Sequence, residues 1–219
     1  MSMTTENNFA QQREEMVQLI RGRGVRDEAV CNALRGVRRE HFVPGELSSH
    51  AYDDSPLPIG NDQTISQPYI VALMTAELGI KPGDRVLEIG AGSGYAAAIL
   101  ACVTSEVYTV ERHAELADQA ARRLKEHGFD NVRVHCGDGT LGWPEHSPFD
   151  AITVAAGGPE VPKPLLEQLA VGGRLVMPVG SDRREQRLVR VIKVGQHEYH
   201  HEDLGGVHFV PLVGQAGWN

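Results

Sequence analysis

A short apolar strand, a run of closely spaced glycines and the start of a helix follow one another near the middle of this chain. Val86–Ile89 has the pattern of a buried strand, and Tyr95 begins an apolar helical segment. Between them stand Gly90, Gly92 and Gly94. Glycine permits a sharp turn and lets a ligand approach main-chain atoms that a side chain would shield. The sequence therefore predicts a strand, a tight turn and a helix, with the turn open to a ligand.

The pattern on either side of this turn alternates between helix and strand. Helices are expected at 68–78, 94–102, 114–127 and 162–170, and strands at 85–90, 106–110, 132–136, 150–155 and 173–179. Apolar strands that alternate with helices are typical of a mostly parallel sheet covered on both faces. Three further strands, expected at 186–194, 197–204 and 206–213, have no helices between them, which favours an antiparallel edge.

The first fifty residues have the pattern of a helical appendage. Apolar residues recur at helical spacing in Asn8–Ile20 and Asp27–Val37. Residues 51–65 are rich in Asp, Pro, Gly and Asn, and a long irregular segment is expected there. The predicted fold class is α/β: a Rossmann-like, doubly wound, mostly parallel sheet with an N-terminal helical appendage and an antiparallel C-terminal edge. The appendage and its loop would span 1–65 and the core 66–219, packed as one compact unit.

Composition excludes several function classes. The formal net charge of −8 argues against nonspecific nucleic-acid binding, which needs basic patches. Neither a charged leader nor an apolar run of about 18 residues is visible, so secretion and a membrane span are not expected. Cys31, Cys102 and Cys136 are scattered and lack metal-ligand spacing, which favours a reducing compartment. We expect a cytoplasmic protein, and a monomer.

A carboxylate stands where an adenosine cofactor needs one. Glu111 follows the strand at 106–110, about twenty residues after the glycines, and can accept both ribose hydroxyls. The dinucleotide fingerprint has a sixth-position glycine where this chain has Tyr95, and Glu88 suits a cationic ligand better than a pyrophosphate. An NAD-dependent oxidoreductase is therefore disfavoured. The spacing E-x-G-x-G-x-G resembles the first motif of the class I methyltransferases, which bind S-adenosylmethionine.

Further segments narrow this resemblance to one family. In chain order they are Ala51–Pro56, Gln63–Pro68, Gly137–Gly139, Pro148–Ile152, Gly172–Gly180 and Phe209–Leu212. From about residue 40 to residue 213 the chain resembles the protein-L-isoaspartate (D-aspartate) O-methyltransferases, with Thr-Ile-Ser and Phe-Val-Pro-Leu as the specific motifs.

The resemblance implies a repair reaction. A methyl group passes from S-adenosylmethionine, leaving S-adenosylhomocysteine, to the free α-carboxylate of L-isoaspartyl residues and more weakly of D-aspartyl residues. The substrates are damaged proteins and peptides, and the ester then closes to a succinimide. A carboxyl methyltransferase for one dedicated peptide or small-molecule carboxylate would need the same loop and serine, so this alternative stays open.

The resemblance implies that Ser66 is the catalytic position, beside the substrate carboxylate. Ser66 lies just before Pro68, so a helix cap is the structural alternative, and the two roles are compatible. A carboxylate with a pKa near 4 is already ionised at neutral pH, so no strong general base is needed. The lack of a Ser-His-Asp set or a metal cluster is therefore expected.

The other site residues come from the glycine turn and the resemblance together. The cofactor residues are Gln63, Thr64, Ile65, Ser66, Tyr69, Glu88, Gly90, Ala91, Gly92, Ser93, Gly94, Glu111, Arg112, Gly137, Asp138 and Gly139. The substrate-binding residues are Ser66, Val154, Ala155, Ala156, Val210, Pro211 and Leu212. Helix packing is the alternative for Tyr69, and a plain Asp-Gly turn is the alternative for Asp138.

Three positions depart from the family pattern, and a group of histidines invites a metal hypothesis. Gly157 and Gly158 stand in a turn that is expected to be rich in alanine, and Val213 stands where some relatives have threonine. His200 and His201 would face opposite sides of a strand and cannot readily share an ion. No metal is expected.

Overall fold

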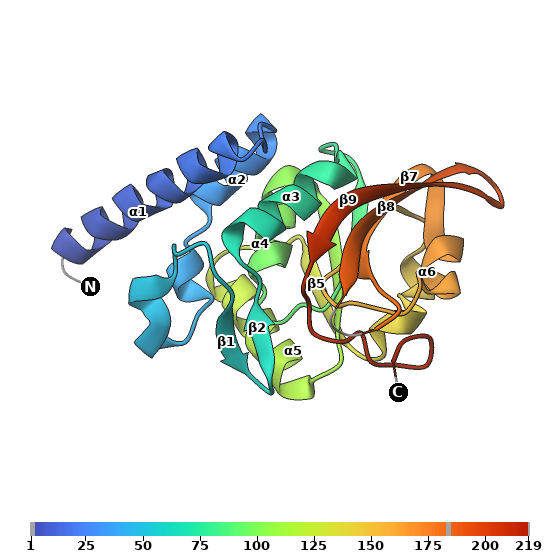
Figure 1. The fold of residues 1–219 in the computed structure, drawn as a ribbon. Coiled ribbons are helices and arrows are strands. Elements are labelled where there is room, and N and C mark those ends of the chain that lie inside the picture. The colour runs from blue at the N-terminus through green and yellow to red at the C-terminus, as the bar shows by residue number, and fades with distance from the viewer. Residues whose placement is uncertain (1–2, 183–184, 219) are drawn as a thin grey trace.

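The centre of the protein is a seven-stranded sheet with the strand order β5-β4-β3-β6-β7-β8-β9 (Figure 1). The computed structural model describes residues 3–182 and 185–218. The strands are β3 (Arg85–Ile89), β4 (Glu106–Glu111), β5 (Val132–Cys136), β6 (Phe149–Val154), β7 (Leu169–Val179), β8 (Gln186–Gly195) and β9 (Glu198–Val207). Strands β3 to β7 pair in parallel, and β8 and β9 continue the sheet antiparallel. The predicted mostly parallel sheet with an antiparallel C-terminal edge is confirmed.

The two faces of the sheet bury separate apolar clusters, because successive residues of a strand point to opposite faces. Val86, Val107 and Ala151 belong to one cluster, which also takes in buried residues of α3 (Pro68–Leu78), α4 (Tyr95–Val103) and α5 (Ala114–Glu126). Their neighbours Leu87, Tyr108 and Ile152 belong to the other, which is covered by α6 (Lys163–Gln168). Helices on both faces make the sheet doubly wound, as predicted.

The N-terminal appendage consists of α1 (Met3–Gly22) and α2 (Glu28–Gly36). Their buried residues, among them Val17, Ile20, Val30 and Leu34, belong to the same cluster as α3 and α4. Figure 1 shows both helices on one side of the molecule, with β7, β8 and β9 on the other. The appendage therefore packs directly on the core helices.

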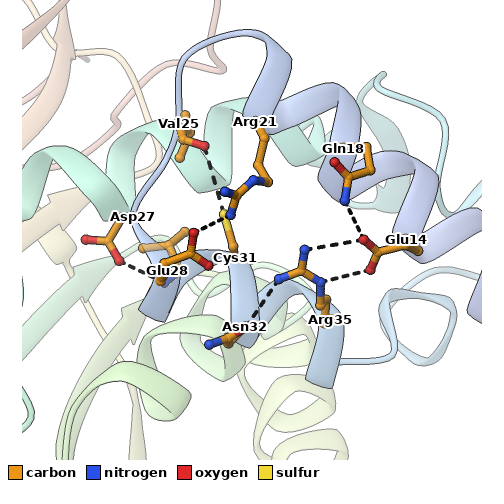
Figure 2. A network of polar contacts seen from close by, with 10 residues as sticks. Glu14, Gln18, Arg21, Val25, Asp27, Glu28, Cys31, Asn32 and Arg35 are labelled. Carbon is orange, nitrogen blue, oxygen red and sulfur yellow. Dashed lines mark hydrogen bonds and ion pairs between the residues drawn. The ribbon is translucent and has the colours of Figure 1, made fainter.

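Polar contacts link α1 to α2 on their outer side (Figure 2). Arg35 pairs with Glu14 at 2.8 Å, and Arg21 pairs with Glu28 at 2.5 Å. Within the second helix, the Asp27 side chain caps the N-terminus of α2 by accepting a hydrogen bond from the Val30 N–H group. The two ion pairs are largely exposed, and exposed pairs contribute about 0–1 kcal/mol each. The apolar face therefore holds the two helices in place, and the ion pairs add little.

The segment at 51–65 is more regular than the sequence suggested. After two short 3-10 turns, η1 (Arg39–His41) and η2 (Gly45–His50), the chain forms a hairpin of β1 (Leu57–Gly60) and β2 (Gln63–Ile65). Its turn residues Asn61 and Asp62 have φ values of 52° and 56°. Asn and Asp tolerate this left-handed conformation, which the tight turns of hairpins require. The prediction of a wholly irregular segment is wrong, because the turn lacks the usual glycine in second position.

The strand expected at 206–213 is also absent. β9 runs on to Val207, and the chain after it makes isolated bridges, from Pro211 to Gly157 and from Val213 to Trp218. Proline has no N–H group and cannot support a regular ladder.

Candidate active site

A pocket opens at the carboxyl ends of the parallel strands, where the strand order reverses. From β3 the chain moves outward through β4 to β5, then returns to place β6 on the other side of β3. In open α/β sheets ligands bind at such a switch point. The pocket wall consists of the hairpin and the residues after β3, β4 and β6, together with 210–213: Gln63, Thr64, Ile65, Ser66, Val71, Ile89, Gly90, Ala91, Gly92, Ser93, Tyr95, Ala96, Val110, Glu111, Arg112, His113, Gly139, Ala155, Ala156, Val210, Pro211, Leu212 and Val213.

The glycine turn after β3 follows the predicted geometry. Gly90, Gly92 and Gly94 have φ values of 94°, 51° and 90°, which side chains disfavour. Gly90 and Gly92 line the pocket. Gly94 does not, and a Cβ there would lie 3.4 Å from Ala120 and Leu124 of α5. The first two glycines therefore open the wall, and the third supplies the left-handed φ from which α4 begins.

Glu111 ends β4 at the pocket and is 5 % exposed. Its Oε2 accepts a 2.9 Å hydrogen bond from the Gly92 N–H group, and its Oε1 accepts one of 2.9 Å from the His113 N–H group. Each oxygen keeps further acceptor capacity, since a carboxylate offers about four lone-pair sites. Glu111 therefore both supports the glycine turn and can accept hydrogen bonds from ribose hydroxyls.

Ser66 lies on the pocket wall immediately after β2. The helix cap of α3 falls on Gln67, which makes no side-chain capping bond, while the Asp54 carboxylate accepts a 2.9 Å hydrogen bond from the Tyr69 N–H group. Ser66 is therefore not the helix cap, contrary to the structural alternative. Its own carbonyl oxygen accepts a 2.9 Å hydrogen bond from the guanidinium of Arg39.

Tyr69 does not line the pocket. The guanidinium of Arg23 lies 3.5 Å from the centre of its ring, and Arg23 also pairs with Asp54. Tyr69 thus joins the chain after α1 to the start of α3. This geometry matches the packing alternative, and a cofactor contact from Tyr69 stays a prediction.

Glu88 lies behind the pocket and not on its wall. Its side chain is fully buried, and its Oε2 accepts a 2.6 Å hydrogen bond from the Thr109 hydroxyl. Its Oε1 has no hydrogen-bond partner among the described residues, and Glu88 lines a cavity of about 30 Å³ shared with Ser66 and Thr153. Burial raises the pKa of Glu88 to about 8, despite the opposing bond from Thr109. Burial therefore favours the neutral form of this carboxyl group over the standing negative charge that the sequence suggested.

Asp138 stands beside the pocket, but its carboxylate is already engaged. Oδ1 accepts hydrogen bonds from the N–H and hydroxyl groups of Thr140 at 2.9 and 2.7 Å, and Oδ2 accepts one from the Gln215 N–H group at 2.8 Å. Burial alone would raise the pKa of Asp138, but these bonds outweigh it and lower the pKa. Gly139 lines the pocket, whereas Gly137 and Asp138 do not.

The predicted substrate segment is fixed to the loop after β6. The Gly157 N–H group donates to the Val210 carbonyl and the Gly157 carbonyl accepts from the Leu212 N–H group, both at 2.8 Å. The Gln186 side chain bonds both backbone polar groups of Phe209, at 2.8 and 3.1 Å. A Cβ on Gly157 would lie 2.5 Å from the Gln186 amide nitrogen. The glycine that departs from the expected alanine therefore leaves room for this side chain.

The structure brings most of the predicted residues together. The predicted residues outside the wall are Tyr69, Glu88, Gly94, Gly137, Asp138 and Val154, and the wall residues that the predicted set lacks are Val71, Ile89, Tyr95, Ala96, Val110, His113 and Val213. Sequence neighbourhood could have indicated His113 and Tyr95, which adjoin predicted positions. Val71 and Ala96 come from helix faces that have no local signal.

These features fit S-adenosylmethionine. The open backbone at Gly90 and Gly92 admits a ligand, and Glu111 provides ribose acceptors. The unpartnered Oε1 of Glu88 lies behind the same wall, in a cavity that shares Ser66, Val71, Ala96 and Ala155 with the pocket.

Across residues 3–182 and 185–218, no group of three or more His, Cys, Asp or Glu side chains is placed to hold a metal ion. Within the same ranges, no helix is both long and apolar enough to cross a membrane. The exposed His200 lies 3.5 Å from Glu202 of the same strand.

Comparisons by sequence link the chain to one family. The model of the protein-L-isoaspartate (D-aspartate) O-methyltransferase family matches residues 10–217. A protein-L-isoaspartate O-methyltransferase 2 of Pelobacter propionicus is 56 % identical over 219 residues, which is all of this chain and 97 % of the relative. A protein-L-isoaspartate O-methyltransferase 1 of Rhodopseudomonas palustris is 58 % identical over 212 residues, which is 96 % of this chain and 86 % of the relative.

Solved structures agree with the sequence relatives. A protein-L-isoaspartate O-methyltransferase aligns with a TM-score of 0.84 at 32 % identity, over 94 % of this chain and 67 % of its own. A putative protein-L-isoaspartate O-methyltransferase from Plasmodium falciparum, solved in complex with S-adenosyl-L-homocysteine, aligns with a TM-score of 0.81 at 26 % identity, over 92 % of this chain and 98 % of its own.

Proposed function

This chain belongs to the protein-L-isoaspartate (D-aspartate) O-methyltransferase family, and we propose that it starts the repair of damaged proteins. It transfers a methyl group from S-adenosylmethionine to the α-carboxylate of L-isoaspartyl residues, and more weakly of D-aspartyl residues. The observation that carries this function is a single pocket that joins the glycine turn, Glu111, Ser66 and Val210–Leu212. The relatives do not favour a dedicated small-molecule substrate.

The residues of this pocket have to position the reactants, because the substrate carboxylate is already ionised at neutral pH. S-adenosylmethionine, when bound, supplies a methyl group activated by its sulfonium. Glu111 accepts hydrogen bonds from ribose hydroxyls, and the backbone of the glycine turn lies against the cofactor. The Ser66 hydroxyl donates a hydrogen bond to the carboxylate and orients one of its oxygens. Positioning of this kind can supply about 7–11 kcal/mol in favourable systems.

The substrate chain lies along the segment at 210–212 in this proposal. Val210 and Leu212 give one backbone group each to Gly157, which fixes the segment without using its side chains. Ala155 and Ala156, from the loop after β6, leave space for an isoaspartyl backbone. Val213 has no hydroxyl group, so a side-chain hydrogen bond to substrate is missing at this position.

We also propose that the protein works as a monomer in the cytoplasm. Its three cysteines are free, and Cys31 is buried while Cys102 and Cys136 are exposed. Exposed free thiols suit a reducing compartment. Sedimentation equilibrium measures the oligomeric state directly.

Methyl transfer from labelled S-adenosylmethionine to matched peptides tests the function. We expect a peptide with one L-isoaspartyl residue to be methylated, and its twin with a normal L-aspartyl residue to be inert. The proposed site takes a carboxylate that is attached directly to the main chain. A normal aspartyl residue has no free carboxylate at that position. Comparable labelling of both peptides would end the repair proposal, and labelling of neither would redirect the search to a dedicated substrate.

Replacing Glu111 with alanine should weaken S-adenosylhomocysteine binding by at least about a hundredfold. Hydrogen bonds to a charged group contribute roughly 1.5–3 kcal/mol each, and the carboxylate is proposed to accept two from the ribose. Isothermal titration calorimetry measures the affinity, and circular dichroism checks the fold. Glu115→Ala, at an exposed position in the first turn of α5, is the matched control and should bind normally. Unchanged affinity in Glu111→Ala would remove Glu111 from the ribose role.

A further inference from the structure

The last described residues, 213–218, form a hook that returns to the active site, and we call them the C-terminal hook. The Trp218 N–H group donates to the Leu212 carbonyl at 2.7 Å, which closes the hook on itself. The Gln215 N–H group donates to Asp138 Oδ2 at 2.8 Å, and the Ala216 N–H group to the Thr140 hydroxyl at 3.1 Å. The hook is thus fixed to the loop after β5.

Two glycines allow the hook to pack closely. A Cβ on Gly214 would lie 2.1 Å from Asp138 Oδ1, and one on Gly217 would lie 2.3 Å from the Leu212 carbonyl oxygen. Real Cβ atoms do not approach other atoms at such distances, so a larger residue at Gly217 would displace the hook, and one at Gly214 would displace the hook or the Asp138 carboxylate that holds it. The hook is therefore a built part of the structure and not a loose tail.

The indole of Trp218 reaches Gly157, the residue that holds the predicted substrate segment. Its Nε1–H group donates a 2.9 Å hydrogen bond to the Gly157 carbonyl, which also accepts the Leu212 N–H group. The Gly157 N–H group in turn donates to the Val210 carbonyl. Gly157 fixes the register of 210–212, and Trp218 holds Gly157 from the outside.

We infer that Trp218 is a positioning residue for substrate binding, and that the C-terminal hook joins the substrate segment at 210–212 to the loop at Asp138–Thr140. This inference rests on the proposed function, because it takes 210–212 as the segment that binds the peptide. Trp218 lies one residue beyond the range that the family model matches. Its role is to keep the backbone groups of 210–212 ready for an extended chain.

The test uses Trp218→Phe, which keeps an aromatic ring and the backbone N–H group but removes the indole Nε1–H donor. We expect KM for the isoaspartyl peptide to rise about three- to tenfold, since one hydrogen bond is lost, while kcat and the affinity for S-adenosylhomocysteine stay near wild type. Amide hydrogen exchange across 209–213 should become faster, because the Leu212 N–H group loses its rigid acceptor. The matched control is Trp143→Phe, at the other tryptophan, whose ring packs edge-on against Tyr108 and His146.

A second variant displaces the hook without touching Trp218. Gly214→Ala in the Trp143→Phe background leaves Trp218 as the sole tryptophan, so its emission should shift to the red as the ring becomes exposed. KM for the peptide should rise at least as much as in Trp218→Phe.

Several outcomes would overturn the inference. The first is a Trp218→Phe variant in which both KM and the amide hydrogen exchange of 209–213 are unchanged. The second is a lower kcat for this variant at unchanged KM. Equal losses in Trp143→Phe would reduce the effect to general destabilisation. If wild-type protein methylates no isoaspartyl peptide, the proposed function fails. The exchange measurement then still decides whether Trp218 positions 209–213.

Discussion

Replacing Arg39 with methionine should lower kcat for methyl transfer by about a hundredfold while S-adenosylhomocysteine binds within a few-fold of wild type. Arg39 is fully buried, and its guanidinium donates to the Ala51 carbonyl at 2.7 Å and to the Ser66 carbonyl at 2.9 Å. Losing these bonds frees the backbone that presents Ser66. A displacement of about 1 Å in a positioned group can cost a hundredfold in rate.

The cost of burying this arginine supports a role in the site. Burial lowers the pKa of Arg39, the direction expected for a cation removed from water. Nη1 has no hydrogen-bond partner among the described residues, and the guanidinium lies 4.7 Å from the centre of the Tyr95 ring. Tyr95 follows the glycine turn, so one cation links the cofactor side of the pocket to Ser66. An apolar side chain of similar volume would be cheaper to bury.

A double-mutant cycle tests whether Arg39 acts through Ser66. Ser66→Ala should itself lower kcat, and Arg39→Met should add little in that background, since residues that act as a unit are not additive. Arg35→Met, at a half-buried arginine of α2 that pairs with Glu14, is the matched control and should leave kcat unchanged. Additive losses for Arg39 and Ser66 would show that Arg39 acts elsewhere. In Arg39→Met the Ala51 and Ser66 carbonyls lose their donor, which costs about 1–3 kcal/mol of stability for each. The assays should therefore be run well below the melting temperature of the variant.

Arg39 also illustrates what the sequence does not reveal. The sheet and its helices could be predicted, because the periodicity of apolar residues and the glycines at turns are local features of the sequence. The glycine turn, Glu111 and Ser66 could be predicted because each lies within a short motif. Arg39 stands in a mixed run of charges, and its partners Ala51 and Ser66 lie 12 and 27 residues further along the chain.

Some predicted site residues lie outside the pocket wall, and distant segments of the chain explain their positions too. The partner that occupies Tyr69 is Arg23, which belongs to the chain after α1. The partner that occupies Asp138 is the Gln215 backbone, 77 residues away. A sequence pattern identifies the type of side chain at a turn, but the contacts of that side chain depend on which distant segments the fold brings beside it.

Replacing Glu88 with glutamine should stabilise the cofactor-free protein, and the gain should grow as the pH rises from about 5 to about 9. The pKa of Glu88 is raised from 4.5 to about 8 by burial. The folded state therefore holds a proton that the unfolded chain releases above its own lower pKa. The stability linked to this proton is fully present below about pH 4.5 and is lost as the pH rises through about 8. At about 1.4 kcal/mol for each pKa unit, the wild-type protein loses several kcal/mol over this range.

The Glu88→Gln variant should not lose this stability as the pH rises, because glutamine stays neutral at every pH. Its amide oxygen can accept the bond from the Thr109 hydroxyl, and its amide group can occupy the cavity beside Ser66 and Thr153. For a chain of this length a change of 1 kcal/mol moves the melting temperature by roughly 2–4 °C, so a difference of about 10 °C between variant and wild type is expected near pH 9. Differential scanning calorimetry at several pH values measures it.

The matched control is Glu106→Gln, at the start of β4. A hydrogen bond from Arg85 lowers the pKa of Glu106, so this carboxylate stabilises the folded state only when ionised, and its removal should give no gain at high pH. Repulsion from Glu111 adds to the effect of burial on the pKa of Glu88. A gap in melting temperature between Glu88→Gln and wild type that does not change with pH would contradict the buried proton. A gap that widens with pH would show that the protein keeps a buried acid behind Ser66 at the expense of stability, as sites kept for function do.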